Sequence, residues 1–253
     1  MPRLFCPLPL VSGARVQLPA QAARHAQVLR LQPGDTVTLF NGEGGEFAAV
    51  IEQMGRSDVT VQVGLHTATE REAARGVHVV LGIPANERMD WLVEKAAELG
   101  AASIQPLLTE RSVLRLAGER ADKRRSHWQA IAVAACEQCG RNRLPTVHPL
   151  QTFAHWARAM TAPPLPGLRL LLSLQPQARP LSETLASDAA NGGRVTLLSG
   201  PEGGLSAAEE ALALGLGFVP VTLGPRILRA ETAPLAALLL ACDQGWPRHA
   251  GRV

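Results

Sequence analysis

Apolar residues in the second half of the chain alternate between short continuous runs and longer segments with helical spacing. Four runs with the length and composition of buried strands lie at 77–83, 103–108, 168–174 and 195–199. Between the first two runs, residues 87–99 carry apolar side chains every three or four positions, and Gly100 follows where a helix commonly ends. Strands that alternate with helices predict an α/β fold with a mostly parallel sheet.

Helical spacing recurs further along the chain. Apolar residues from Trp128 to Cys139 mark one face of a second helix, while the proline-rich segment 145–166 predicts a loop with a short helix. A last helix, 233–242, is apolar all round and uncharged until Asp243. Such a helix must be covered on nearly every side, and burial inside its own domain is the default.

The first 72 residues follow a different pattern. Three segments with the composition of strands lie at 36–40, 46–51 and 58–63. The glycine-rich loop 41–45 joins the first two as a hairpin, and residues 21–30 are the helical candidate. Residues 67–75 are polar and lack apolar periodicity, which is typical of a linker. The sequence therefore predicts two domains, a small β-rich barrel over 1–72 and the α/β domain over 73–253.

Two strand-loop-helix units follow one another between Val195 and Thr232. The first strand breaks into a Gly-Pro-Glu-Gly-Gly loop at 200–204, and the second, at 218–223, breaks into another Gly-Pro loop. Ligands of open α/β sheets bind beyond the carboxyl ends of the strands, so these loops are natural walls of one site. Glycine permits the backbone angles and close ligand approach that such a wall requires.

The two loops differ in how strongly they indicate a function. Ser206 and Glu209 have the spacing of a capping box, so the first loop ends at a helix N-terminus, although an ordinary tight turn uses the same residues. The second loop places two arginines and a glutamate around apolar Ile227 and Leu228. Structural loops seldom need that mixture.

Together the loops, Gly-Pro-Glu-Gly-Gly at 200–204 and Leu-Gly-Pro-Arg-Ile-Leu-Arg-Ala-Glu-Thr-Ala at 223–233, resemble the SPOUT methyltransferases. The specific resemblance is to the small-subunit (16S) rRNA uridine-N3 methyltransferase family called RsmE. The segment 94–100 resembles a family segment as well, and residues 25–35 resemble its PUA-like N-terminal domain. The resemblance implies a trefoil knot formed by the loops around Gly200 and Gly224, and a homodimer whose interface includes the last helix.

The resemblance also implies S-adenosylmethionine as cofactor and small-subunit rRNA, within the assembled subunit, as substrate. The expected cofactor-binding residues are Leu198, Gly200, Glu202, Gly203, Leu223, Gly224, Ile227 and Leu228. Glu202 has a second interpretation, because a carboxylate also stabilises the helix N-terminus beside it. Uridine N3 carries a proton, so the enzyme must remove it or stabilise the resulting anion. Arg229 is the expected catalytic residue, with Glu231 as its orienting or proton-accepting neighbour.

Six residues are candidates for contact with RNA. They are Arg3, Arg24 and Arg30 in the PUA-like domain, and Arg111, Glu137 and Arg141 in the methyltransferase domain. For each of the first three, an ordinary solvated arginine is an equally good explanation. Glu137 and Arg141 are four positions apart, so an ion pair within one helix competes with a role in RNA binding.

Composition narrows the class of protein. A net charge of +3 permits a nucleic-acid partner without demanding one. Four cysteines are too few for a disulfide scaffold, and Cys136 and Cys139 lack the second pair of ligands that a zinc site needs. The chain begins with no signal peptide, and no apolar run has the length of a membrane span, so a soluble, cytoplasmic protein is expected.

Other catalytic motifs are missing from the sequence. It contains no Gly-x-x-x-x-Gly-Lys-Ser/Thr phosphate loop, no His-Glu-x-x-His and no Gly-x-Ser-x-Gly. Methyl transfer from a sulfonium donor needs positioning and charge management, so no metal is expected. Two alternatives stay open: a non-catalytic RNA-binding ribosome-assembly factor, against which the intact loops argue, and a SPOUT enzyme that methylates a ribose 2′-hydroxyl.

Overall fold

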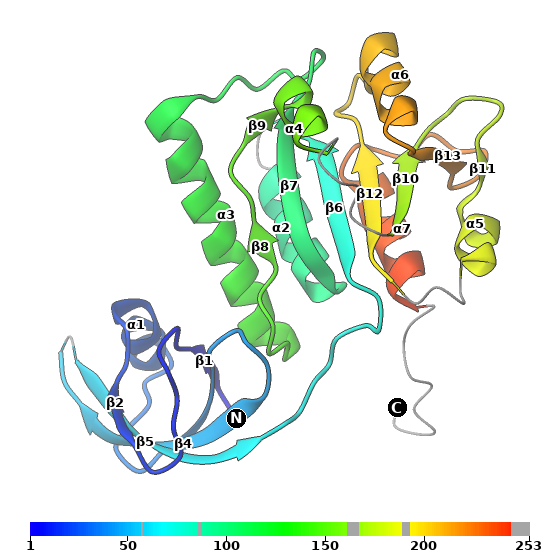
Figure 1. Cartoon of the computed structure of the whole chain (residues 1–253). Helices are drawn as coiled ribbons and strands as arrows, with labels where there is room; N and C mark the ends of the chain where they lie inside the picture. Colours follow the sequence, from blue (N-terminus) through cyan, green and yellow to red (C-terminus); the bar gives the residue numbers. More distant parts are fainter. Residues whose placement is uncertain (57, 86–87, 161–166, 189–192, 244–253) are drawn as a thin grey trace. The chain divides into compact units, whose positions relative to one another are not determined.

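The structure is a computed structural model that describes residues 1–56, 58–85, 88–160, 167–188 and 193–243 (Figure 1). The chain forms two compact units. The first comprises Met1–Glu72 together with Val133–Leu144, and the second comprises Ala73–Ala132 and the described residues from Pro145 onward. The segment that returns to the first unit includes the end of the longest helix, so that helix contributes residues to both.

The first unit is built on a five-stranded sheet with the order β1-β3-β4-β5-β2. Its strands are β1 (Arg3–Phe5), β2 (Arg15–Gln17), β3 (Thr36–Phe40), β4 (Glu46–Met54) and β5 (Val59–Thr67). β1 pairs with β3 in parallel, and the other neighbours are antiparallel. Alternate residues of β5 are buried, as expected for a sheet with one face on the core. The three strands predicted from the sequence are present, and β1 and β2 are additions of three residues each.

Helix α1 (Ala20–Val28) ends two residues before the predicted end because Arg30 has left-handed backbone geometry, with φ of +57°. The Arg30 amide donates to the Gln27 carbonyl (2.9 Å), and the Leu31 amide donates to the Ala26 carbonyl (3.1 Å). These two bonds make a Schellman C-cap, in which the left-handed position usually belongs to glycine. An arginine there is therefore unusual.

The second unit contains an eight-stranded sheet with the order β11-β13-β10-β12-β6-β7-β8, and β9 also pairs with β7. Its strands are β6 (Val77–Gly82), β7 (Ala101–Leu108), β8 (Thr146–Val147), β9 (Gln151–Thr152), β10 (Leu168–Leu172), β11 (Arg179–Pro180), β12 (Val195–Ser199) and β13 (Val219–Thr222). Every pairing given for these strands is parallel. The predicted α/β architecture is confirmed.

Helices cover this sheet (Figure 1). They are α2 (Arg88–Glu98), α3 (Gly118–Cys139), α4 (Phe153–Ala159), α5 (Leu181–Ser187), α6 (Ala207–Gly215) and α7 (Thr232–Asp243). The predicted first residue of α2, Glu87, lies outside the described residues. Helix α3 begins ten residues before the predicted apolar face. The apolar pattern does not reveal its first turns, because they are charged and exposed.

The core of the second unit places its functional loops. Phe153, Trp156 and Phe218 pack in a cluster that also holds Leu171 and Leu198 of neighbouring strands β10 and β12. Helix α7 packs against β12 and β6. Because the strands are parallel, the loops that follow β10, β12 and β13 open at one edge of the sheet. The trefoil knot stays a prediction.

In the described part of the chain, no helix is both long enough and apolar enough to cross a membrane.

Candidate active site

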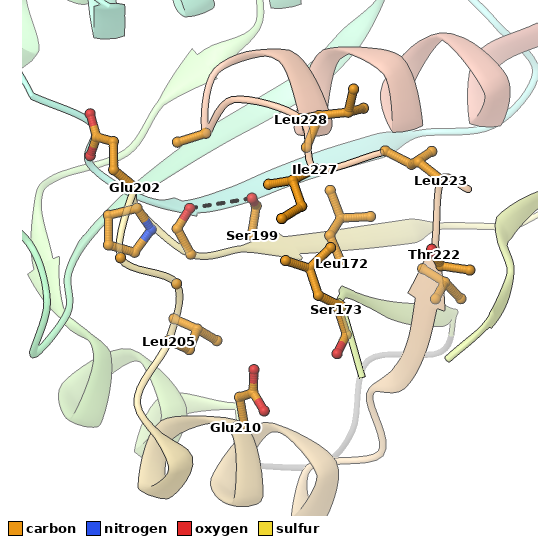
Figure 2. A pocket seen from close by; sticks show the side chains of 18 of the residues that line it. Leu172, Ser173, Ser199, Glu202, Leu205, Glu210, Thr222, Leu223, Ile227 and Leu228 are labelled. Carbon is orange, nitrogen blue, oxygen red and sulfur yellow. Dashed lines mark hydrogen bonds between the residues drawn. The ribbon is translucent and has the colours of Figure 1, made fainter. Parts of the chain in front are cut away.

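A cavity of about 350 Å³ opens where β10, β12 and β13 end (Figure 2). This volume is within the range typical of small-molecule sites. Its apolar wall includes Leu172, Leu205, Leu223, Ile227 and Leu228. Its polar wall includes Ser173, Ser199, Glu202, Glu210 and Thr222. The two Gly-Pro loops therefore form one site, as the sequence predicts.

The first loop folds tightly back on itself. A Cβ atom on Gly200 would lie 2.6 Å from the backbone of both Gly204 and Leu205, so no other residue fits there without a backbone shift. Gly204 has φ of +69°, which favours glycine for a conformational reason. A Cβ on Gly82, the last residue of β6, would lie 2.5 Å from Pro201 Cδ. These close approaches fix the loop above the sheet.

The capping box at the start of α6 is confirmed. Ser206 Oγ accepts from the Glu209 amide (3.2 Å), and Glu209 Oε2 accepts from the Ser206 amide (3.0 Å). The second carboxylate oxygen of Glu209 accepts from the Glu110 amide at 2.9 Å, which ties α6 to the loop after β7. Glu209 is thus a structural residue whose hydrogen bonds hold two loops together at the carboxyl edge.

The second loop presents apolar side chains at the mouth of the cavity. Gly224 has φ of +107°, and its amide donates to Thr222 Oγ1 (3.2 Å), which shapes the turn. Ile227 lines the cavity although 81% of its surface is exposed. An apolar side chain of that size beside a cavity suits a ligand with a flat apolar group that would cover it.

Arg88, at the start of α2, joins the acidic residues of the two loops. Its Nη1 lies 3.1 Å from Glu202 Oε1, which also accepts from the Ala85 amide at 2.9 Å. Its Nε lies 3.9 Å from Glu231 Oε1. Glu231 Oε2 is buried and has no hydrogen-bond partner among the described residues. Arg88 is not among the expected site residues, because a single arginine at the first turn of an amphipathic helix carries no distinctive signal in the sequence.

The two expected catalytic residues lie beside the cavity wall and not in it. Arg229 is exposed, and its carbonyl accepts from the amides of Thr232 (2.9 Å) and Ala233 (3.0 Å), which begins α7. The Glu231 side chain is only 12% exposed. Among the described residues no ion pair joins Arg229 to Glu231, since the nearest cation to Glu231 is Arg88. The Arg229 side chain is therefore not held by its expected neighbour.

Seven of the eight expected cofactor-binding residues line the cavity. These are Gly200, Glu202, Gly203, Leu223, Gly224, Ile227 and Leu228. Leu198 differs, because it is fully buried within β12 and belongs to the core cluster against α4 and α6. Its expected place in the cavity wall needs correction: β12 is buried along its whole length, so the cavity begins only where the strand ends.

Three of the residues expected to contact RNA make internal contacts within the first unit. Arg3 Nη1 lies 2.7 Å from Glu46 Oε2, and its Nη2 lies 2.5 Å from Asn142 Oδ1. Burial alone would raise the pKa of Glu46, but hydrogen bonds from Arg71, Arg3 and Asn142 outweigh it and lower the pKa to about 2. Arg3 is therefore part of a charged network that joins the N-terminal strand to the end of the returning segment.

Glu137 and Arg141 belong to the same returning segment. Glu137 Oε1 accepts from the Phe5 amide (2.8 Å), and its Oε2 lies 3.0 Å from His25 Nδ1. Arg141 binds both carboxylate oxygens of Glu72, with Nε at 3.0 Å and Nη2 at 2.5 Å. These contacts replace the ion pair that the i, i+4 spacing suggested. The structure gives no support to RNA contact by either side chain.

The other three candidates are exposed. Arg24 and Arg30 are exposed at α1 and at its C-cap. Arg111 lines the cavity, and its Nη1 donates to the Gly203 carbonyl at 2.8 Å. Among the described residues, no group of three or more histidine, cysteine or acidic side chains could hold a metal ion.

Family models match both parts of the chain. Residues 71–241 match an RNA methyltransferase domain, and residues 18–64 match an RNA methyltransferase PUA domain. Ribosomal RNA small subunit methyltransferase E of Bacillus subtilis is 31% identical over 83% of this chain and 82% of its own length. The protein of that name from Mycobacterium bovis is 32% identical over 84% of this chain and 80% of its own.

Two solved structures share the fold over nearly the whole chain. One is ribosomal RNA small subunit methyltransferase E from Neisseria gonorrhoeae bound to S-adenosyl methionine, with a TM-score of 0.85, 38% identity, and 94% of this chain and 96% of that one covered. The other is a methyltransferase from Legionella pneumophila in complex with the same cofactor, with a TM-score of 0.82, 34% identity and the same coverage of both chains.

Proposed function

The chain belongs to the family of ribosomal RNA small subunit methyltransferase E, and from this premise we propose that it methylates N3 of a uridine in small-subunit rRNA, with S-adenosylmethionine as methyl donor. The observation that carries the proposal is the cavity walled by both Gly-Pro loops at the carboxyl edge of the parallel sheet. Relatives are named for the ribosomal RNA of the small subunit, so we place the reaction in the cytoplasm.

The cavity suits the chemistry of this cofactor. Leu223, Ile227 and Leu228 offer apolar surface to an adenine ring, and the exposure of Ile227 is explained by such a cover. Glu202 and Glu210 supply carboxylates for ribose hydroxyls and for positive charge. When bound, the cofactor supplies an electrophilic methyl group. The protein has to place the uridine and manage the proton that leaves N3.

Arg229 and Glu231 are the residues that we assign to this task. Arg229 is exposed just beyond Ile227 and Leu228, so its guanidinium is available to the oxygens of a bound uracil, which gain negative charge as N3 loses its proton. Glu231 keeps one buried carboxylate oxygen without a hydrogen-bond partner among the described residues. In this proposal that oxygen accepts the proton, and Arg88 Nε lies 3.9 Å from the other carboxylate oxygen.

Arg229→Ala tests this assignment. We expect cofactor affinity within a few-fold of wild type and turnover about 10²–10³-fold lower, the usual effect of removing one donor that stabilises developing negative charge. Tritium transfer to undermethylated small subunits measures turnover, and calorimetry on the same sample measures S-adenosylmethionine binding. Near-normal methylation by the variant would remove Arg229 from the mechanism.

Product analysis distinguishes uridine methylation from the two alternatives. Small-subunit rRNA from a strain lacking the gene is digested, and the missing methyl group is located by mass spectrometry. A missing methyl on a uracil ring supports the proposal. A missing ribose methyl would assign the enzyme to the 2′-O class, and an unchanged methylation pattern would leave a non-catalytic assembly factor.

We also propose a homodimer that uses α7. This helix is uncharged from Thr232 to Cys242, yet Leu239 and Leu240 are 51% and 42% exposed. Six of its other residues, Pro234, Leu235, Ala237, Leu238, Ala241 and Cys242, are buried inside the second unit. Two adjacent exposed leucines on such a helix suit burial against a second copy of the chain.

A further inference from the structure

We propose that residues 111–125 form a surface for the RNA phosphate backbone that leads from the cavity onto the first half of α3; we call it the basic track. This inference rests on the proposed function, because it takes the bound partner to be RNA. It assigns backbone binding to residues other than Arg3 and Arg141, whose side chains are engaged within the first unit.

Positive charge in the second unit is concentrated in the basic track. Its basic residues are Arg111, Arg115, Arg120, Lys123, Arg124 and Arg125, and its acidic residues are Glu119 and Asp122. The track thus carries a net charge of +4, six positive minus two negative, whereas the whole chain carries +3. The remaining residues together have a net charge of −1, so the basic character of the protein resides in this segment. Phosphate contacts supply most of the sequence-independent affinity for nucleic acid.

The track begins in the cavity wall. Arg111 lines the cavity and is anchored to the Gly203 carbonyl, and the turn around it is fixed by Ser112, whose Oγ accepts from the Thr109 amide at 3.0 Å. Ser112 is buried, so this turn is packed against the rest of the second unit. Figure 1 shows that α3 starts near the edge of the sheet at which β6 and β12 end. RNA whose base enters the cavity can therefore continue along the track.

Three of the four arginine and lysine residues of α3 lie on one exposed face. Arg120, Lys123 and Arg124 are related by i, i+3 and i+4 spacing, and all three are exposed. The buried side of the helix includes Trp128, whose indole donates to Asp90 of α2 (2.9 Å). Arg125 is exposed as well, but its Nε donates to the Val147 carbonyl (3.1 Å). The cationic face is thus held in one orientation by the packing behind it.

The contacts that the cationic face makes leave it able to bind phosphate. Lys123 pairs with Glu119 at 3.3 Å, but the two side chains are 74% and 83% exposed. An ion pair with that exposure contributes little to stability and exchanges readily for another partner. The positive end of the α3 helix dipole adds to the potential at the same end.

The test compares the double variant Arg120→Gln/Arg124→Gln with a matched control, Arg158→Gln/Arg179→Gln, which removes two exposed arginines elsewhere in the second unit. Retention of labelled small-subunit rRNA on filters over a series of salt concentrations measures affinity without requiring turnover. We expect the track variant to bind about tenfold more weakly at moderate salt and to lower the slope of log affinity against log salt by about 2, one for each lost phosphate contact. The control and Arg120→Lys/Arg124→Lys should stay near wild type.

Calorimetric S-adenosylmethionine binding should be unchanged in all of these variants, which shows that the cavity is intact. Equal weakening by the track and control variants would overturn the proposal, because it would reveal an effect of net charge alone. Wild-type affinity and salt slope in the track variant would overturn it as well. Failure of the proposed function gives a different result: the wild-type enzyme would then bind this RNA no better than an unrelated RNA and would transfer no methyl group to small subunits.

Discussion

Arg88 Nη1 lies 3.1 Å from Glu202 Oε1, so the first turn of α2 is tied to the first glycine loop. The same guanidinium approaches Glu231 of the second loop. We predict that Arg88→Gln lowers turnover by about 10², because both carboxylates lose the group that orients them. The ion pairs are partly exposed, so cofactor affinity should fall less than about tenfold.

Methyl transfer and calorimetry on the same preparations check this prediction. Arg88→Lys is the control, since it keeps the charge but loses the planar fork that reaches two partners, and it should recover part of the activity. Wild-type turnover in Arg88→Gln would show that the bridge between the loops has no part in the reaction.

Arg30 occupies the left-handed position at the C-terminal end of α1, where glycine would have no conformational strain. We predict that Arg30→Gly raises the free energy of unfolding of the first unit by up to about 1 kcal/mol, because it removes the conformational cost of a side chain at positive φ. If Arg30 contacts a phosphate, the same variant weakens rRNA binding. Stability and affinity then move in opposite directions.

Chemical denaturation and rRNA binding measure these two effects. Arg30→Ala provides the comparison, since it removes the charge and keeps the strain: it should weaken RNA binding without stabilising the unit. Unchanged RNA affinity in both variants would remove Arg30 from the expected RNA contacts.

His78, in β6, links the stability of the second unit to pH. Burial first, and then the charges of Arg194 and His148, lower the pKa of His78 from 6.5 to about 4. Its Nδ1 lies 2.7 Å from Ser103 Oγ. Below pH 6.5 the unfolded chain binds a proton that the folded one does not, so we predict that stability falls as the pH drops from about 6.5 to about 4.

Denaturation midpoints at pH 7 and pH 5 measure the effect. His78→Gln should be less stable at pH 7 and should depend less on pH over this interval. Glu46 does not contribute to the difference between pH 7 and pH 5. Because its pKa is lowered from 4.5 to about 2, the stability that it provides is lost only as the pH falls from about 4.5 to about 2. An identical pH dependence in the variant and the wild type would assign the loss to other groups.

The proposed dimer predicts a sedimentation result. The wild-type chain at micromolar concentration should sediment with twice its mass, and Leu239→Glu/Leu240→Glu should sediment as a monomer, since charges on the exposed face of α7 oppose its burial. Leu214→Glu on α6 is the control, because Leu214 is 41% exposed, close to the 42% of Leu240. A monomeric wild-type protein contradicts the dimer.

The strands that the sequence predicted have a local pattern, either a continuous apolar run, as in β12, or an alternation of apolar and polar residues, as in β5. Strands β1 and β2 have three residues each and exist through pairing with β3 and β5, which no local pattern records. The glycine loops were predicted correctly as walls of a site, because their residues have to satisfy local backbone geometry. For the same reason the capping box could be identified from two residues.

The long-range contacts could not be predicted from the sequence. Arg88 meets Glu202 across 114 positions, and Arg3 meets Asn142 across 139. The resemblance placed Leu198 among the cofactor-binding residues, but the depth to which a strand is buried depends on what covers both of its faces. Residues 133–144 continue the helical pattern before them, so nothing local marks the point at which they join the first unit.

That shared segment restricts how the protein can be recombined with its relatives. The chain passes between its two units three times, after Glu72, Ala132 and Leu144. A chimera with one junction at Glu72 would give Glu137 and Arg141 foreign partners in place of His25 and the native Glu72. Residues 1–72 and 133–144 therefore have to be inherited as a pair, although 60 residues of the other unit separate them. Exchange of the first unit in this architecture requires three crossovers.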